Sequence, residues 1–98
     1  MNINLEKQNE LLVVRLQGRL DTNTSPAFEE VINNMDSNVK DLLIDIKGLE
    51  YISSAGLRVL LAAQKKMNKL GSMKVANVCD SIMEIFEITG FIDILVIE

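Results

Sequence analysis

The chain has 98 residues, 48% of them hydrophobic, which is enough for a single domain with one core over residues 1–98. Its 10 basic and 14 acidic residues give a net charge of -4, which argues against a nucleic-acid ligand, and the absence of a leader pattern or a membrane-length apolar stretch predicts a cytoplasmic protein with no membrane partner. One cysteine and no histidine exclude an intramolecular disulfide, a histidine-based catalytic triad and a zinc site.

The chain begins with two short apolar segments, residues 3–6 and 11–17, separated by four polar residues. This pattern predicts a hairpin of two antiparallel strands. Gly18 is expected to interrupt the end of the second strand, and a polar loop over residues 19–24 follows it.

The next segment is predicted to be a helix followed by a strand. Pro26 suits the first turn of a helix, and Thr24 or Ser25 can cap it. Apolar residues then recur at a spacing of three and four up to about Met35, which indicates one buried face. The apolar run over residues 39–46 predicts a third strand, buried on both faces for most of its length.

The second half alternates between helices and strands. Residues 57–70 follow helical spacing, and Gly71 is expected to end that helix. Three elements are expected after it: a strand over residues 72–78, a helix from Asp80 or Ser81 to Gly90, and a strand over residues 91–97. The order strand-strand-helix-strand-helix-strand-helix-strand predicts an α/β domain with a mixed sheet of about five strands and about three helices, the later strands being parallel.

Two serines occupy the predicted junction between the third strand and the long helix. Ser53 and Ser54 lie in the sequence YISSAGLR of residues 51–58. A serine at a helix N-terminus can accept a hydrogen bond from a free backbone N–H, and the positive end of the helix dipole also favours a phosphate there. The two serines are therefore either simple caps or the site of a regulatory modification.

This stretch resembles the signature of the STAS family, the domain shared by anti-sigma-factor antagonists and sulfate-transporter tails. Residues 11–21 are similar to the family's second strand and its Gly-x-Leu-Asp turn, and residues 83–91 are similar to its Phe-x-x-x-Gly before the last strand. The resemblance implies a single STAS-like domain of the anti-sigma-factor-antagonist type. Many members continue into a further helix after the last strand, so here we expect either marginal stability or a compensating contact.

The resemblance also implies the site. The phosphoacceptor position falls on Ser54; Ser53 replaces the family's usual Asp and is the alternative acceptor. In such proteins the loop that follows the Gly-x-Leu-Asp turn contributes to kinase binding, although a loop that only caps the next helix is the alternative. The partner-binding residues implied in this way are Asp21, Thr22, Asn23, Thr24, Ser53, Ser54, Gly56, Leu57 and Arg58.

Two of these residues have competing explanations. Gly56 in the first turn of a helix costs about 1 kcal/mol relative to Ala, so something approaches its backbone closely, either a partner or the protein's own sheet. Arg58 is either a contact to the partner or phosphate, or a solvated surface residue.

The function implied by the resemblance is regulatory, without enzymatic activity. The unphosphorylated protein is expected to bind an anti-sigma serine kinase of the histidine-kinase-like ATPase type, to be released on serine phosphorylation, and to be restored by a serine phosphatase. ATP and magnesium would belong to the kinase, with no cofactor or metal on this chain, and the unbound form is expected to be a monomer. The alternatives are a constitutive STAS scaffold without a phosphoswitch and, less well supported by the residues, a small-molecule-binding module.

Overall fold

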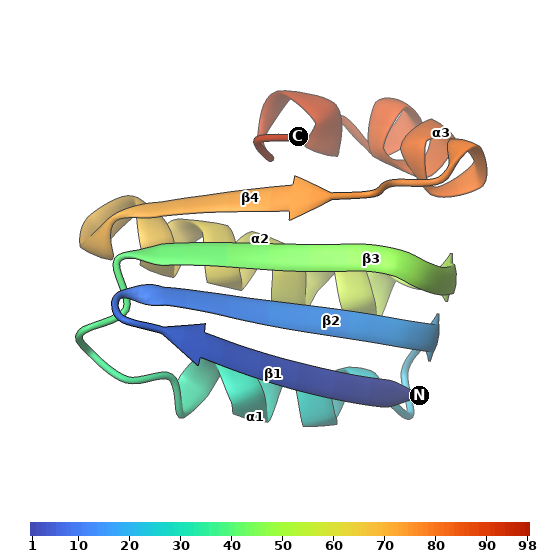
Figure 1. Cartoon of the computed structure of the whole chain (residues 1–98). Helices are drawn as coiled ribbons and strands as arrows, with labels where there is room; N and C mark the ends of the chain where they lie inside the picture. Colours follow the sequence, from blue (N-terminus) through green and yellow to red (C-terminus); the bar gives the residue numbers. More distant parts are fainter.

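The two N-terminal strands form the predicted hairpin, and both are longer than expected. In the computed structural model, which describes residues 1–98, β1 (Asn2–Gln8) and β2 (Leu11–Leu20) pair antiparallel across a short turn (Figure 1). Gly18 does not end β2. Its φ is +98°, a conformation that glycine adopts readily. Directly after Gly18 the pairing of β2 with the next strand of the sheet shifts register, and β2 continues beyond this irregularity.

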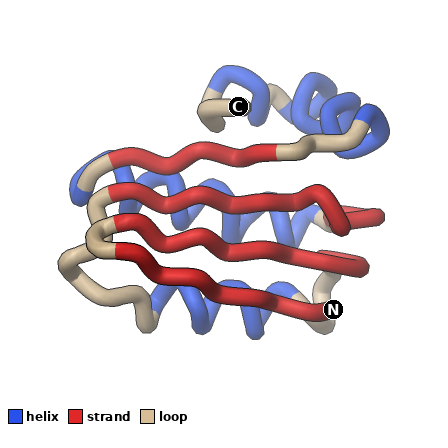
Figure 2. Tube along the Cα trace, in the orientation of Figure 1, coloured by secondary structure: helices blue, strands red, loops and turns tan.

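The sheet has four strands in the order β1-β2-β3-β4. β3 (Asp41–Ile52) and β4 (Ser72–Ala76) run parallel to β2, as predicted for the later strands. The helix α1 (Ser25–Asn33) connects β2 to β3, and α2 (Ser54–Leu70) connects β3 to β4. Because both right-handed crossovers step in the same direction across the sheet, both helices lie on the same face, behind the strands in Figure 1 (Figure 2 separates the layers by colour).

The prediction that the third strand is buried on both faces was wrong. Leu42, Ile44 and Ile46 point toward the helices and are at most 2% exposed, whereas Lys47 on the other face is exposed. On that open face Asp45 lies 3.6 Å from the Nε of Arg15. The reason is topological: with every crossover on one side, no helix covers the second face, and charged side chains occupy it instead.

The helix α3 (Asp80–Thr89) ends at Gly90 as predicted, but the fifth strand expected over residues 91–97 does not form. Phe91–Asp93 form a 3-10 turn, and main-chain bonds to Gly90 and Phe91 continue it through Leu95. The turn uses the residues that would have extended the sheet. The predicted order is therefore correct up to its last strand.

Only the last residues of the chain reach the sheet. Ile97 forms a single parallel bridge with Val75 of β4. The Val75 N–H donates to the carbonyl of Val96, and the Glu98 N–H donates to the carbonyl of Val75, both at 2.9 Å. These bonds partly close the outer edge of β4.

The core lies between the sheet and the helices and includes 22 buried hydrophobic residues. Phe28 of α1 and Phe86 of α3 are its largest fully buried side chains. The Nζ of Lys66 in α2 donates to the carbonyl of Ile32 near the end of α1 at 2.8 Å, which ties the two helices together. None of the helices combines the length and the hydrophobicity needed to cross a membrane.

Candidate functional site

The carboxyl ends of β2 and β3 bring the predicted site residues together. The two strands are parallel neighbours, and Leu20 lies opposite Ile52 at their ends. The loop after β2 and the start of α2 therefore leave the sheet at the same edge, where open α/β sheets commonly place functional residues. The Ser53 N–H donates to the carbonyl of Leu20 at 2.9 Å and joins the two segments.

Ser53 is the N-cap of α2, as its position in the sequence predicted. Its backbone is extended, and its Oγ accepts a hydrogen bond from the Gly56 N–H at 3.3 Å. The side chain is half-buried. Ser53 therefore has a structural role that involves its hydroxyl.

Ser54 is the first residue of α2 and differs from Ser53 in its exposure and in the hydrogen bonding of its hydroxyl. It is exposed, and its hydroxyl forms no hydrogen bond within the chain. It lies in the first turn, where the positive end of the helix dipole favours an anion. Of the two candidate acceptors, Ser54 is the one whose hydroxyl is free to react.

Gly56 faces its own sheet. A Cβ at this position would lie 2.8 Å from the Cγ of Leu20 and 2.9 Å from the Cγ1 of Ile52, closer than real Cβ contacts. Packing against the sheet therefore explains the glycine. Leu57 beside it is 8% exposed and belongs to the core. Gly56 and Leu57 set the position of the first turn of α2 but do not lie on its surface.

The loop after β2 is held by its own side chains. The Asp21 carboxylate accepts hydrogen bonds from the N–H of Asn23 at 3.0 Å and of Thr24 at 3.1 Å. The Thr24 hydroxyl accepts from the Asp21 N–H at 2.9 Å and lies 2.7 Å from the carbonyl oxygen of Arg19. Thr24 is the N-cap residue of α1, but its side chain bonds the loop instead of the helix. Thr22 and Asn23 are left exposed at the tip.

A shallow hollow of about 160 Å³ separates this loop from α2. Thr22 and Pro26 line one side, Ala55 and Arg58 line the other, and Glu29 of α1 contributes to it. The hollow is smaller than the usual cofactor pocket. No group of acidic or cysteine side chains in the chain has the arrangement of a metal site. The geometry therefore suits contact with the surface of another macromolecule.

Two further residues at this edge were not predicted from the sequence. Arg19 and Tyr51 are cross-strand partners, and the Arg19 guanidinium lies 4.2 Å from the centroid of the Tyr51 ring. The same guanidinium lies 3.9 Å from the Asp21 carboxylate. The register of β2 against β3 was the signal that could have revealed them, and it depends on two irregularities in the pairing.

Comparisons with known proteins agree with this arrangement. A family model described as the STAS domain matches residues 2–98. The chain belongs to the STAS domain family. This confirms the resemblance inferred from the motifs around Ser54.

Curated relatives of this STAS domain match almost its whole length. The anti-sigma-B factor antagonist of Bacillus subtilis (strain 168) is 35% identical over 98 residues, which cover 97% of this chain and 90% of the relative. The putative anti-sigma factor antagonist BtrV of Bordetella bronchiseptica is 31% identical over 96 residues, with coverage of 96% and 83%.

Solved structures share the fold of this STAS domain. The crystal structure of an anti-sigma factor antagonist from Mycobacterium paratuberculosis superimposes with a TM-score of 0.87 at 25% identity, covering 98% of this chain and 83% of that one. The phosphorylated form of the Bacillus cell fate determinant SpoIIAA superimposes with a TM-score of 0.78 at 19% identity, covering 99% and 91%. The second similarity concerns the fold alone.

The hydrogen bonds of the loop predict a measurable titration. The main-chain N–H of Thr24 is the largest influence that lowers the pKa of the Asp21 carboxyl. Partial desolvation opposes it, while the Thr24 hydroxyl, the Asn23 N–H and Arg19 also lower the pKa. Since the folded-state pKa lies below the unfolded value, ionised Asp21 stabilises the loop above the unfolded pKa, and this contribution is lost as the pH falls through the folded pKa.

We expect an NMR titration to give Asp21 a midpoint below about 3.9, the value for an unperturbed Asp. Thr24→Val removes the hydroxyl and should raise this midpoint. Thr22→Val, a matched change in the same loop at a residue that does not bond Asp21, should leave it in place. An unchanged midpoint in Thr24→Val would contradict a contribution of the Thr24 hydroxyl, which lies 3.1 Å from the Asp21 carboxylate.

Proposed function

We propose that this STAS domain is an anti-sigma-factor antagonist that works by partner switching. Unphosphorylated, it binds an anti-sigma serine kinase of the histidine-kinase-like ATPase type, and phosphorylation of Ser54 releases it. The domain is a substrate of that kinase and not an enzyme. ATP and magnesium belong to the kinase, and a serine phosphatase restores the binding form. The protein acts in the cytoplasm, where these partners and ATP are present.

One observation carries the proposal. The Ser54 hydroxyl is exposed and unbonded at the N-terminus of α2, beside the hollow formed with the loop after β2. Ser53 is half-buried and already caps the helix, which supports Ser54 as the acceptor. The relatives named anti-sigma-B factor antagonist or putative anti-sigma factor antagonist supply the class of partner.

Phosphate at Ser54 is compatible with the fold. It adds a charge of about -1.5 to -2 at a helix N-terminus, where the dipole contributes about 0.3–1 kcal/mol of stabilisation. Arg58 follows four residues later on the same side of α2 and is exposed, so its guanidinium can approach that phosphate. The phosphate therefore acts on the interface with the kinase, where its charge and its hydration shell must be accommodated.

The second candidate is a constitutive STAS scaffold without a phosphoswitch. The self-bonded loop and the capping role of Ser53 favour it, because both give these residues a purely structural purpose. In a scaffold, the exposed Ser54 hydroxyl has no function, and modification at that position changes no interaction.

Phosphorylation in extract separates the two functions. Purified wild-type protein, Ser54→Ala and Ser53→Ala are incubated with labelled ATP, magnesium and soluble extract of the source organism, and the modified residue is mapped by mass spectrometry. We expect label on Ser54 in the wild type and in Ser53→Ala, and none in Ser54→Ala. Label confined to Ser53 would identify Ser53 as the acceptor in place of Ser54. No label in any variant would favour the scaffold.

A further inference from the structure

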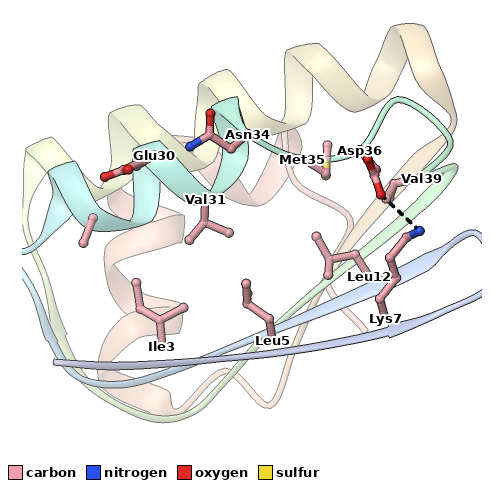
Figure 3. A pocket seen from close by; sticks show the side chains of 11 residues that line it. Ile3, Leu5, Lys7, Leu12, Glu30, Val31, Asn34, Met35, Asp36 and Val39 are labelled. Carbon is pink, nitrogen blue, oxygen red and sulfur yellow. Dashed lines mark ion pairs between the residues drawn. The ribbon is translucent and has the colours of Figure 1, made fainter.

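The groove between β1 and α1 is the largest cavity of the domain and lies away from Ser54. It has a volume of about 570 Å³. Ile3 and Leu5 of β1 form its floor, Val31 of α1 faces them, and Met35 and Leu12 continue the apolar lining (Figure 3). Leu5 is 52% exposed although it lies within a strand. The groove therefore presents apolar surface that nothing in the chain covers.

The strand that forms this floor also has a free edge. β1 is the outermost strand, and its turn leaves Gln8 opposite Leu11. In a hairpin closed by two residues, the pair beside the turn exchanges both main-chain hydrogen bonds, and bonded pairs then alternate along the ladder. Gln8, Glu6 and Asn4 thus bond β2. The N–H and C=O groups of the residues between them point outward.

No other segment bonds these outward groups. None of the main-chain hydrogen bonds outside the helices and strands involves residues 1–9. A row of unpaired N–H and C=O groups is a template for another extended chain. The unpaired groups of Ile3, Leu5 and Lys7 run along the apolar groove. One extended segment could therefore bond the edge of β1 and place side chains in the groove.

The two ends of the groove differ in whether their charged side chains form an ion pair. At one end the Nζ of Lys7 lies 3.3 Å from the Asp36 carboxylate. At the other end Glu30 of α1 also lines the groove and forms no ion pair (Figure 3). An occupant with a basic side chain near Glu30 would therefore be favoured.

We propose that this groove binds an extended peptide segment of a partner protein, which adds as a strand to the free edge of β1. Alternate apolar side chains of the peptide enter the groove above Leu5, and a Lys or Arg of the peptide pairs with Glu30. Strand addition of this kind takes its affinity from main-chain bonds and its specificity from alternate side chains.

A second copy of the chain fits this edge less well. Pairing β1 with β1 of another copy about a two-fold axis would bring the two α1 helices face to face. The exposed side of α1 carries Glu29, Glu30, Asn33 and Asn34, so two negatively charged helix faces would meet, and this repulsion favours a basic peptide over a second copy. The hollow beside Ser54 uses Pro26 and Glu29, on a different side of α1, so the groove can be occupied whether or not the partner switch operates.

The probe is a phage-displayed library of random nine-residue peptides, selected on the full-length wild-type protein. Enriched sequences are synthesised with blocked ends and titrated by fluorescence polarisation. We expect alternate apolar residues with a Lys or Arg on the same face of the peptide. Amide hydrogen exchange should slow at Ile3, Leu5 and Lys7 when the peptide binds.

The variants test the edge and the charge separately. Leu5→Pro removes an outward N–H without breaking the ladder to β2, and Leu5→Ala keeps that N–H. We expect Leu5→Pro to weaken binding at least about tenfold more than Leu5→Ala, and Glu30→Lys to weaken it about tenfold. Glu87→Lys, an equal charge change on the exposed side of α3, should have no effect.

Three results would overturn the proposal. The first is a selection that returns no peptide above background. The second is a set of selected peptides that bind Leu5→Pro and Glu30→Lys as tightly as the wild type. The third is a wild-type dimer in sedimentation that Leu5→Pro dissociates, which would make a second copy the occupant. If Leu5→Pro fails to fold, the amide hydrogen exchange of β1 in the wild type, measured with and without peptide, still tests whether the peptide binds this edge.

Discussion

Ser54→Asp is expected to weaken binding of the kinase by about thirtyfold to several thousandfold, which corresponds to about 2–5 kcal/mol. In the proposed complex, the carboxylate would lie where the unbonded hydroxyl of Ser54 faces the kinase. A charge desolvated in that interface without a counter-charge on the kinase has this cost. The fold should be unaffected, because an acidic residue in the first turn of α2 interacts favourably with the helix dipole.

The measurement is a quantitative pull-down from soluble extract, with wild-type, Ser54→Ala and Ser54→Asp proteins as baits. Capture of a kinase-like ATPase by the first two and not by the third is the expected result. Ser81→Asp is the matched control, because it adds the same charge in the first turn of α3 at another exposed serine. Equal recovery by all baits would exclude the Ser54 switch and leave the scaffold, or Ser53, to be tested.

Phe28→Ala is expected to lower the free energy of unfolding by about 3–5 kcal/mol, as truncation of buried aromatic residues does. Phe28 is fully buried, and α1 buries only Ser25 and Ile32 besides it. The loss is large for a domain of this size, whose total stability is about 5–15 kcal/mol. Because α1 lies between the hollow and the groove, both surfaces should loosen with it.

Urea denaturation followed by circular dichroism measures this change, and the melting temperature should fall by more than about 10 °C. Glu29→Ala, on the exposed side of the same helix, should stay within about 0.5 kcal/mol of the wild type. A loss below about 1 kcal/mol for Phe28→Ala would show that α1 is held by other contacts.

Local patterns were sufficient for most of the fold. The polar break before Leu11 predicted the hairpin, and Gly71 and Gly90 marked the ends of two helices. The two largest errors concern tertiary structure. Burial on both faces of β3 failed because the direction of the crossovers decides which face is covered, and the last strand failed because the turn after Gly90 uses its residues.

The site was predictable as a position but not in its contacts. The sequence indicated that Ser53 and Ser54 lie at a helix N-terminus, and they do. Which serine is half-buried and which is exposed depends on how α2 packs against the ends of β2 and β3. The same packing explains Gly56, and the irregular register of those strands brings Arg19 onto Tyr51. None of these follows from spacing along the chain.

The hydrogen bond from Ser53 to Leu20 gives the domain a built-in spectroscopic reporter. The Ser53 N–H lies between the loop after β2 and Ser54, the proposed acceptor, and it donates to the Leu20 carbonyl oxygen at an N–O distance of 2.9 Å. Its chemical shift responds to the length of that bond, so any displacement of the loop relative to α2 would be visible in the unlabelled protein. One resonance could thus follow modification and partner release in real time.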